Sequence, residues 1–165
     1  MAEPAAPNYR KTIIDHIMPH ARADKRIVLL VGDMGFGAID KFAQEFPSRF
    51  YNLGMMEQGM IGIAAGMAMA GLKPLVYSMP NFLAFRAIEQ VRNDVVHQKL
   101  AVKIIATGVN DYFKFLGHSH CCGEQDAEIM AMVGMRVHDP YIEPRPFVEL
   151  VDAFIADDVP AYLRV

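Results

Sequence analysis

Cysteine is scarce in this 165-residue sequence, which contains only Cys121 and Cys122. The two are adjacent, and neighbouring residues rarely reach the geometry of a structural disulfide. This argues against a fold held together by disulfides and fits a reducing compartment. The chain is also long enough to build a hydrophobic core without such crosslinks.

The sequence lacks an apolar run that could span a membrane. Its longest apolar stretch, residues 59–72, is shorter than the roughly 20 residues that a transmembrane helix requires. The opening letters "MAEPAAPNYRK" contain no apolar core of a secretory signal. We therefore expect a cytoplasmic protein that does not bind a membrane.

Charge of one sign is not concentrated anywhere in the chain. The formal net charge is −3 and the basic residues are scattered, which is unlike the basic patch of a nucleic-acid binder. Hydrophobic residues make up 53% of the sequence, an apolar composition for a soluble protein of this length. We expect a tail at residues 1–8 and one domain at residues 9–165, with part of its apolar surface against a partner.

Six short apolar runs, each typical of a buried strand, alternate with stretches of helical pattern. The runs are "KRIVLLVGDMG", "RFYNLG", "KPLVYSM", "LAVKIIATG", "MRVHD" and "PAYLRV". The predicted helices cover residues 9–21, 38–46, 56–70, 82–97, 124–132 and 145–156. This alternation favours an α/β fold of three layers, in which helices cover both faces of a mostly parallel sheet of about six strands.

Ligands bind at the carboxyl ends of the strands in such sheets. Unusual residues follow the predicted strands there, at Asp33, 54–57, 78–82, 107–110 and Asp139. The loop at residues 109–123 is long and rich in His, Phe and Cys, and loops of that length inside compact domains are usually functional. It is a candidate lid or substrate-binding loop.

Glu57 stands at the start of a predicted helix in "NLGMMEQGMIGIAAGMAMAG". One interpretation is a helix-start charge, because the free N–H groups of a first turn favour a negative side chain. The many glycines and alanines that follow favour another, since they let a second helix or backbone approach closely and leave the carboxylate poorly hydrated. Desolvation raises a carboxyl pKa, which suits a group that shares a proton with a ligand nitrogen.

The stretch "RFYNLGMMEQGMIGIAAGMAMAGLKPLVYSM" resembles the pyrimidine-binding domain of transketolase-like, thiamine-diphosphate-dependent enzymes. Their pattern is R-F-x-N-x-G-I-x-E-Q-x-M-x-G-I-A-A-G-x-A-x-x-G-x-x-P. The resemblance continues through "FLAF", "EQVRND", "LAVKIIATG", "GHSHC" and "PAYLRV". It implies the thiamine-diphosphate-binding fold of the pyrimidine-domain type, with thiamine diphosphate as cofactor.

The resemblance also implies a catalytic role for Glu57. In the family, the glutamate of the E-Q pair hydrogen-bonds N1′ of the cofactor's aminopyrimidine ring and draws the ring toward its imino tautomer. The 4′-imino nitrogen then takes the proton from C2 of the thiazolium, and the resulting ylide attacks a substrate carbonyl.

Phe82, Phe85 and Ile88 are three residues apart along one face of a predicted helix. Spacing alone favours ordinary core packing. The resemblance implies instead that Phe82 and Phe85 wall the aminopyrimidine, and we expect Met56 and Met79 to contact the cofactor as well.

The segment "GHSHCCGE" contains His118, His120, Cys121 and Cys122, all of which are potential metal ligands. Ligands this close together cannot easily surround one tetrahedral ion, and strong zinc signatures use separated pairs, so we expect no metal site here. In the family, a G-x-T-H-Q segment lies at this place and its histidine faces the substrate. The resemblance therefore implies a catalytic, substrate-binding His120, with His118 as a second substrate-binding candidate.

Asp33 and Arg10 are further candidates for substrate binding. Asp33 in "VGDMG" either contacts the substrate or caps the next turn. Arg10 in "YRK" matches a segment whose arginine binds substrate phosphate in transketolases, or it is a solvated charge at a helix end. Sugar-phosphate transketolases also carry an Asp where this chain has "FKFL", so one contact to a substrate hydroxyl is missing.

The family holds the cofactor's diphosphate through Mg²⁺ on a separate domain, whose motif is G-D-G followed by Asn. This chain has only "GDMG", on a segment that matches the first strand of the pyrimidine domain. The resemblance therefore implies a partner subunit that carries the diphosphate half and the Mg²⁺ ligands, in an α₂β₂ assembly.

The reaction implied is ketol or acyl transfer, or C–C carboligation, on a small carbonyl substrate. One alternative is the β-type subunit of a 2-oxoacid dehydrogenase or decarboxylase, whose sequences resemble "IEQVRNDV". Another is a non-catalytic scaffold domain of the same fold.

Overall fold

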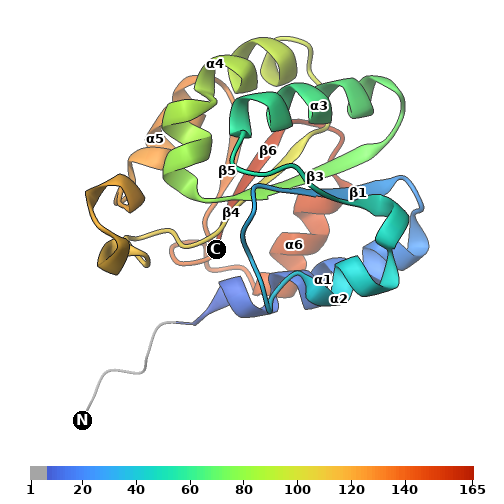
Figure 1. Cartoon of the computed structure of the whole chain (residues 1–165), viewed down its shortest axis with the longest axis horizontal. Coiled ribbons are helices and arrows are strands. Elements are labelled where there is room, and N and C mark those ends of the chain that lie inside the picture. Colours follow the sequence, from blue (N-terminus) through green and yellow to red (C-terminus); the bar gives the residue numbers. More distant parts are fainter. Residues whose placement is uncertain (1–6) are drawn as a thin grey trace.

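The computed structural model describes residues 7–165 and contains a six-stranded sheet (Figure 1). All neighbouring strands are parallel, in the order β2-β1-β3-β4-β6-β5. The strands are β1 (Ile27–Val31), β2 (Phe50–Asn52), β3 (Lys73–Ser78), β4 (Lys103–Ala106), β5 (Arg136–His138) and β6 (Ala161–Arg164). The predicted parallel sheet is confirmed, whereas most of the predicted tail lies outside the described residues.

Helices cover both faces of the sheet, which gives the three predicted layers (Figure 1). One face carries α1 (Tyr9–Ala23), α2 (Asp40–Glu45) and α6 (Phe147–Ala156), and the other carries α3 (Glu57–Met69), α4 (Ile88–Gln90) and α5 (Gln125–Met132). Each face has its own apolar core, and alternate residues of β1 belong to each. None of the helices within residues 7–165 combines the length and apolar character needed to cross a bilayer.

The predicted helix at residues 82–97 is wound differently from the other helices. Its two ends, Phe82–Arg86 and Val91–Val96, are π-helical, and only the short α4 between them is α-helical. Turns of π-helix close hydrogen bonds between residues five apart and occur frequently at functional sites. The spacing of the apolar residues fits an ordinary helix equally well, so the sequence pattern could not reveal this winding.

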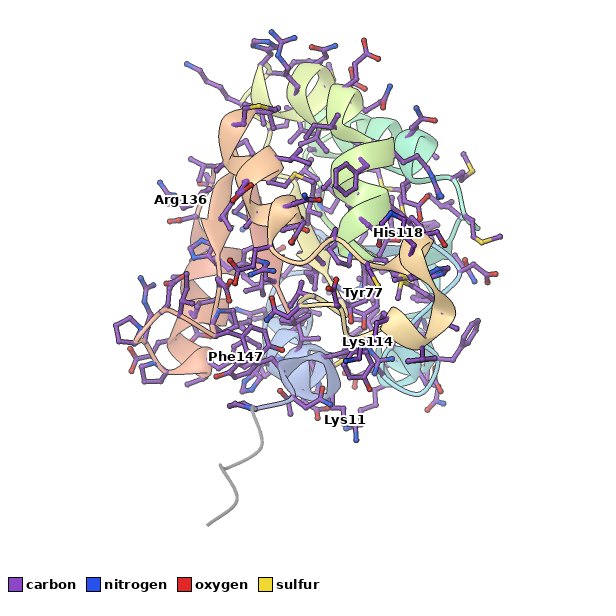
Figure 2. The ribbon with its side chains drawn as sticks, turned by 90° about the vertical axis from the view of Figure 1, so that its left-hand side faces the viewer. Lys11, Tyr77, Lys114, His118, Arg136 and Phe147 are labelled. Atoms are coloured by element: carbon purple, nitrogen blue, oxygen red, sulfur yellow. The ribbon has the colours of Figure 1, made fainter. Side chains whose placement is uncertain are left out.

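The loop at residues 109–123 follows β4 and contains a short 3₁₀ turn, His118–His120 (Figure 2). Its base is fixed by Asp111, whose Oδ1 accepts hydrogen bonds from the backbone N–H groups of Cys122 (3.0 Å) and Gly123 (2.8 Å). Asp111 therefore holds the two ends of the loop together.

A cluster of buried charged side chains lies at the carboxyl end of β6. Nε of Arg164 donates to Oδ2 of Asp126 over 3.1 Å, and the same guanidinium is bonded to Asp139. The hydroxyl of Tyr162 donates to Asp126 over 2.8 Å. The carboxylate of Asp139, noted in the sequence for its place after a strand, thus serves as a counter-ion of Arg164.

Candidate functional site

Glu57 begins α3, and its side chain is completely buried. The hydroxyl of Ser78, at the end of β3, donates to Oε1 over 3.0 Å. Nη1 of Arg86 lies 2.5 Å from Oε2 and forms an ion pair with it. A buried charge requires such partners, because burial removes its hydration. The burial agrees with the poor hydration expected from the sequence, whereas the ion pair with Arg86 was not predicted.

The backbone passes very close to Glu57 at Gly32, the residue directly after β1. A Cβ atom on Gly32 would lie 2.9 Å from Oγ of Ser78 and 3.3 Å from Oε1 of Glu57. Glycine therefore leaves the space in which the hydroxyl and the carboxylate meet. The sequence did not predict this contact, because the glycine of "VGDMG" and Glu57 are far apart along the chain.

Arg86 links Glu57 to the aromatic ring of Phe82. Cζ of Arg86 lies 4.3 Å from the Phe82 ring centroid, which is a cation–π arrangement. Both residues belong to the π-helical segment Phe82–Arg86. Because 41% of the Arg86 side chain is exposed, this cation lies between the buried carboxylate and solvent.

A cavity of about 330 Å³, which we call the Asp33 cavity, opens at the carboxyl edge of the sheet. It brings together predicted residues from distant parts of the chain, since its lining includes Arg10, Asp33, Met79, Phe82 and His120. Gly32 and Met55 also line it. The cavity therefore adjoins the backbone that packs against Glu57.

Asp33 has a left-handed backbone conformation, with φ of 52°. Asn52, at the end of β2, holds it there by donating from Nδ2 to Oδ1 of Asp33 and by accepting from its backbone N–H, each over 3.1 Å. The carboxylate is exposed at the cavity. Asp33 therefore lines the cavity, and its contact with a substrate stays a prediction.

A second cavity, of about 530 Å³, shares Phe82 with the first. We call it the His118 cavity, and its lining includes Phe85, Arg86 and His118. The Phe85 side chain is 51% exposed. The two predicted aromatic residues, Phe82 and Phe85, therefore both line the His118 cavity.

His120 packs edge-to-face against Phe82, with 5.4 Å between the ring centroids. Oγ of Ser119 lies 2.9 Å from Nδ1 of His120, which orients the ring at the Asp33 cavity. The amide of Asn81 is hydrogen-bonded to the carbonyl of Ser119 and ties this turn to the π-helical segment. The structure thus brings His120 to the same cavity as Asp33, while His118 lines the other one.

The two cysteines are free thiols. Burial raises the pKa of the Cys122 thiol to about 12, so it stays protonated and is a poor metal ligand or nucleophile. Sγ of Cys121 lies 3.6 Å from the carbonyl oxygen of Gly117. Within residues 7–165, no group of three or more His, Cys, Asp or Glu side chains is arranged to hold a metal ion.

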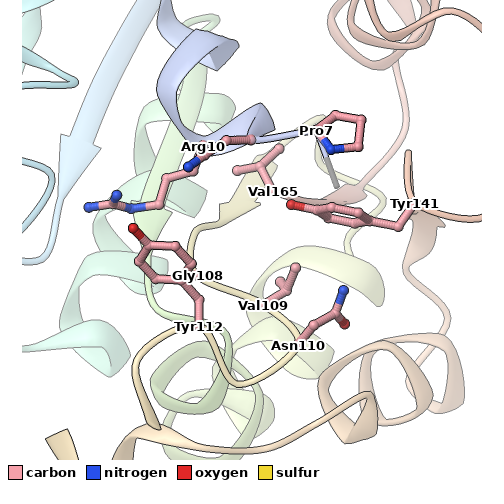
Figure 3. Close-up of a pocket in the computed structure, with 9 residues that line it drawn as sticks. Pro7, Arg10, Gly108, Val109, Asn110, Tyr112, Tyr141 and Val165 are labelled. Carbon is pink, nitrogen blue, oxygen red and sulfur yellow. The ribbon is translucent and has the colours of Figure 1, made fainter. Parts of the chain in front are cut away.

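Arg10 lies between the Asp33 cavity and a third pocket of about 240 Å³ at the carboxyl ends of β4 and β6 (Figure 3). Its Cζ is 5.0 Å from the ring centroid of Tyr112 and 5.2 Å from that of Phe113. Figure 3 shows Arg10 beside Tyr112, with Tyr141 across the pocket. Nε of Arg10 is buried and has no hydrogen-bond partner among the described residues. Arg10 is therefore a half-buried cation at two pockets.

Met55 lines the Asp33 cavity, whereas Met56, the predicted cofactor contact, does not. Met56 is 46% exposed, and its terminal methyl folds back over Gly59. Adjacent residues ahead of a helix point in different directions, so the sequence did not decide which of the two faces the site. Met79, which is buried after β3, lines the cavity, and its contact with the cofactor stays a prediction.

The sequence matches the family described as transketolase, pyrimidine binding domain, over residues 5–165. The chain belongs to this family. The 6-deoxy-6-sulfo-D-fructose transketolase subunit SqwH of Clostridium sp. (strain MSTE9) is 30% identical over 157 residues, which cover 94% of this chain and 48% of that protein. A subunit of the apulose-4-phosphate transketolase of Phocaeicola vulgatus is 32% identical over 157 residues, which cover 94% of this chain and 50% of that protein. The chain thus spans about half the length of these curated relatives.

A solved structure described as split gene transketolase, inactive beta4 tetramer, is 30% identical, with a TM-score of 0.79 over 94% of this chain and 50% of that chain. Transketolase from Leishmania mexicana has the same fold, with a TM-score of 0.74 at 20% identity over 98% of this chain and 26% of that chain. The resemblance seen in the sequence is confirmed. The chain has the pyrimidine-binding domain of transketolase-like enzymes, and this family implies thiamine diphosphate as cofactor.

The described residues fit the aminopyrimidine half of this cofactor. In the position that the Arg86 guanidinium occupies, a protonated ring nitrogen could donate a hydrogen bond to Oε2 of Glu57, and a planar ring could stack on Phe82. The diphosphate half requires oxygen ligands around Mg²⁺. Residues 7–165 do not assemble such a set.

Proposed function

We propose that the chain is the pyrimidine-binding subunit of a split, thiamine-diphosphate-dependent transketolase-like enzyme. The observation that carries the proposal is the buried carboxylate of Glu57 at the head of α3. Arg86 links it to Phe82, and Gly32 separates it from the Asp33 cavity. Thiamine diphosphate, when bound, supplies an electron sink for the carbanion formed from a carbonyl substrate. The proposed reaction is ketol or acyl transfer, or C–C carboligation.

In this proposal, Glu57 would hold the proton that it shares with N1′ of the aminopyrimidine. Ser78 supports that role by fixing the carboxylate through its hydrogen bond. Gly32 supports it by leaving space for the carboxylate and the Ser78 hydroxyl. Phe82 would pack on the ring, and Met79 and Phe85, which line the two adjoining cavities, would add further contacts.

The Asp33 cavity is the proposed substrate site. His120 would hold or move a proton at a substrate oxygen, since its ring is oriented by Ser119 and lines this cavity. Asp33 would accept a hydrogen bond from a substrate hydroxyl. Arg10 is a half-buried cation whose Nε has no hydrogen-bond partner among the described residues, and it would bind an anionic group of the substrate. His118 would contact any part of the substrate that extends into the His118 cavity.

A partner subunit would complete the site. Two of the relatives are themselves described as transketolase subunits, and the chain spans about half of each. Large apolar side chains that line the Asp33 cavity are exposed, with Phe36 at 73%, Met55 at 76% and Leu116 at 51%. Covering such side chains is typical of obligate interfaces. We propose a cytoplasmic α₂β₂ enzyme in which the diphosphate and Mg²⁺ are held by the other type of subunit.

Calorimetry with thiamine diphosphate and Mg²⁺ tests this proposal. The isolated chain should bind weakly or not at all, and addition of a diphosphate-binding subunit encoded beside it should restore tight binding. The partner alone serves as the control. Tight binding and turnover by the isolated chain would contradict the proposal.

The products identify the reaction class. Carbon dioxide release from a 2-oxo acid would favour the dehydrogenase or decarboxylase alternative, and a lengthened carbon chain would favour transfer or carboligation. A tight complex that binds no cofactor would favour the scaffold alternative.

A further inference from the structure

Glu57 has no exposed surface, so a ligand reaches its carboxylate only if a neighbouring group moves. Ser78, which is bonded to Oε1, is itself fully buried, and Gly32 approaches through its backbone. Arg86 is bonded to Oε2 through the tip of a side chain that is 41% exposed. Of these neighbours, Arg86 is the one that can leave without disturbing the sheet.

The guanidinium of Arg86 makes the two contacts that an aminopyrimidine ring would require. It is planar, its Cζ lies 4.3 Å from the Phe82 ring centroid, and it donates an N–H to Oε2 of Glu57. An aromatic ring with a nitrogen donor would use the same face of Phe82 and the same oxygen. The two planar groups cannot occupy that position together.

We propose that Arg86 is a displaceable counter-ion of Glu57, which leaves when an aminopyrimidine takes its position against Phe82 and Oε2. This inference rests on the proposed function and adds to it a positioning residue that controls access to the carboxylate. The His118 cavity, which Arg86 also lines, gives the displaced side chain about 530 Å³ of room.

Displacement has a cost, because the ion pair must break before the ring nitrogen is bonded. Hydrogen bonds between charged groups are stronger than neutral ones. The guanidinium should therefore slow and weaken cofactor binding, and a variant without it should bind faster and more tightly. A residue that held the cofactor directly would have the opposite effect.

The test uses Arg86→Met, which keeps much of the aliphatic stem and removes the planar head. Arg92→Met is the matched control, since Arg92 is an exposed arginine further along the same helical region. The dissociation constant and association rate of thiamine diphosphate with Mg²⁺ are measured on the assembled two-subunit enzyme, by calorimetry and stopped-flow fluorescence. We expect about a tenfold lower dissociation constant and faster association for Arg86→Met, with no change for Arg92→Met.

Equal or weaker binding by Arg86→Met would overturn the proposal while leaving the proposed function intact. Absence of binding by both the wild type and the variant would overturn the proposed function and this inference with it. If Arg86→Met does not fold, Arg86→Lys replaces it, because lysine keeps the charge and loses the planar stack on Phe82. A smaller gain in affinity is then expected, and a loss or no change would overturn the proposal.

Discussion

The hydroxyl of Ser78 and the carboxylate of Glu57 meet over 3.0 Å in a place where neither side chain has exposed surface. The bond joins the end of β3 to the head of α3, two elements that pack directly on each other. Because the acceptor is charged, the bond is at the stronger end of the range for hydrogen bonds in proteins. The position of the carboxylate is therefore tied to a central strand.

Ser78→Ala should lower the free energy of unfolding of the isolated chain by about 2 kcal/mol, because it leaves one oxygen of a buried carboxylate without its donor. Urea unfolding measures the change, and Ser48→Ala, at an exposed serine, is the control. An unchanged unfolding midpoint for Ser78→Ala would show that the hydroxyl does not hold the carboxylate.

Gly32→Ala should destabilise the chain and abolish cofactor binding by the assembled enzyme, since its Cβ would lie 2.9 Å from Oγ of Ser78. Gly66→Ala is the control, because Gly66 lies on α3 with nothing within 4 Å of an added Cβ. That control should raise the free energy of unfolding by roughly 0.5–1 kcal/mol, since alanine favours a helix. Equal effects of the two substitutions would contradict the close packing at Gly32.

His120→Ala should lower kcat or raise KM for the substrate and leave the dissociation constant of thiamine diphosphate unchanged. The reason is that His120 lines the Asp33 cavity and does not contact Glu57. Steady-state kinetics and calorimetry are compared with those of His97→Ala, at an exposed histidine. A collapse in cofactor affinity would place His120 at the cofactor.

Lys103 provides a prediction about pH. Burial lowers the pKa of its amine to about 8, while Nζ donates to the carbonyl of Val159 over 2.7 Å. In the unfolded chain the pKa is about 10.4. Between these values the unfolded chain binds more protons than the folded one, so the contribution of Lys103 to stability rises with pH across this window.

The comparison is between the wild type and Lys103→Met. The two proteins contain the same ionisable groups apart from Lys103, so the difference between them isolates the contribution of that amine. The difference in unfolding free energy should shift in favour of the wild type as the pH rises from about 7 to about 10. A difference that stays constant across this range would show that the Lys103 amine is not shifted.

The sheet could be predicted from the sequence because each strand is a continuous apolar run, and such runs occur where both faces of a strand are buried. The poor hydration of Glu57 could be predicted for a similar reason, since the small residues of α3 let neighbouring segments approach it. These features depend on composition within one segment, which a sequence displays directly.

The contacts of Glu57 could not be predicted in the same way. Gly32, Ser78 and Arg86 come from three different segments, and Arg86 ends the π-helical segment Phe82–Arg86. No local pattern distinguishes that winding from an α-helix. The sequence did not predict that Met55 lines the cavity, because adjacent residues ahead of a helix point in different directions.

The most direct test of the proposed function is the turnover of Glu57→Gln in the assembled enzyme, beside Glu149→Gln on the opposite face of the sheet. The amide cannot share a proton with N1′ as the carboxyl does, so we expect turnover to fall by about a hundredfold or more while the fold is retained. Glu149→Gln should match the wild type. Wild-type turnover in a folded, cofactor-loaded Glu57→Gln enzyme would contradict the assignment of Glu57 and the function built on it.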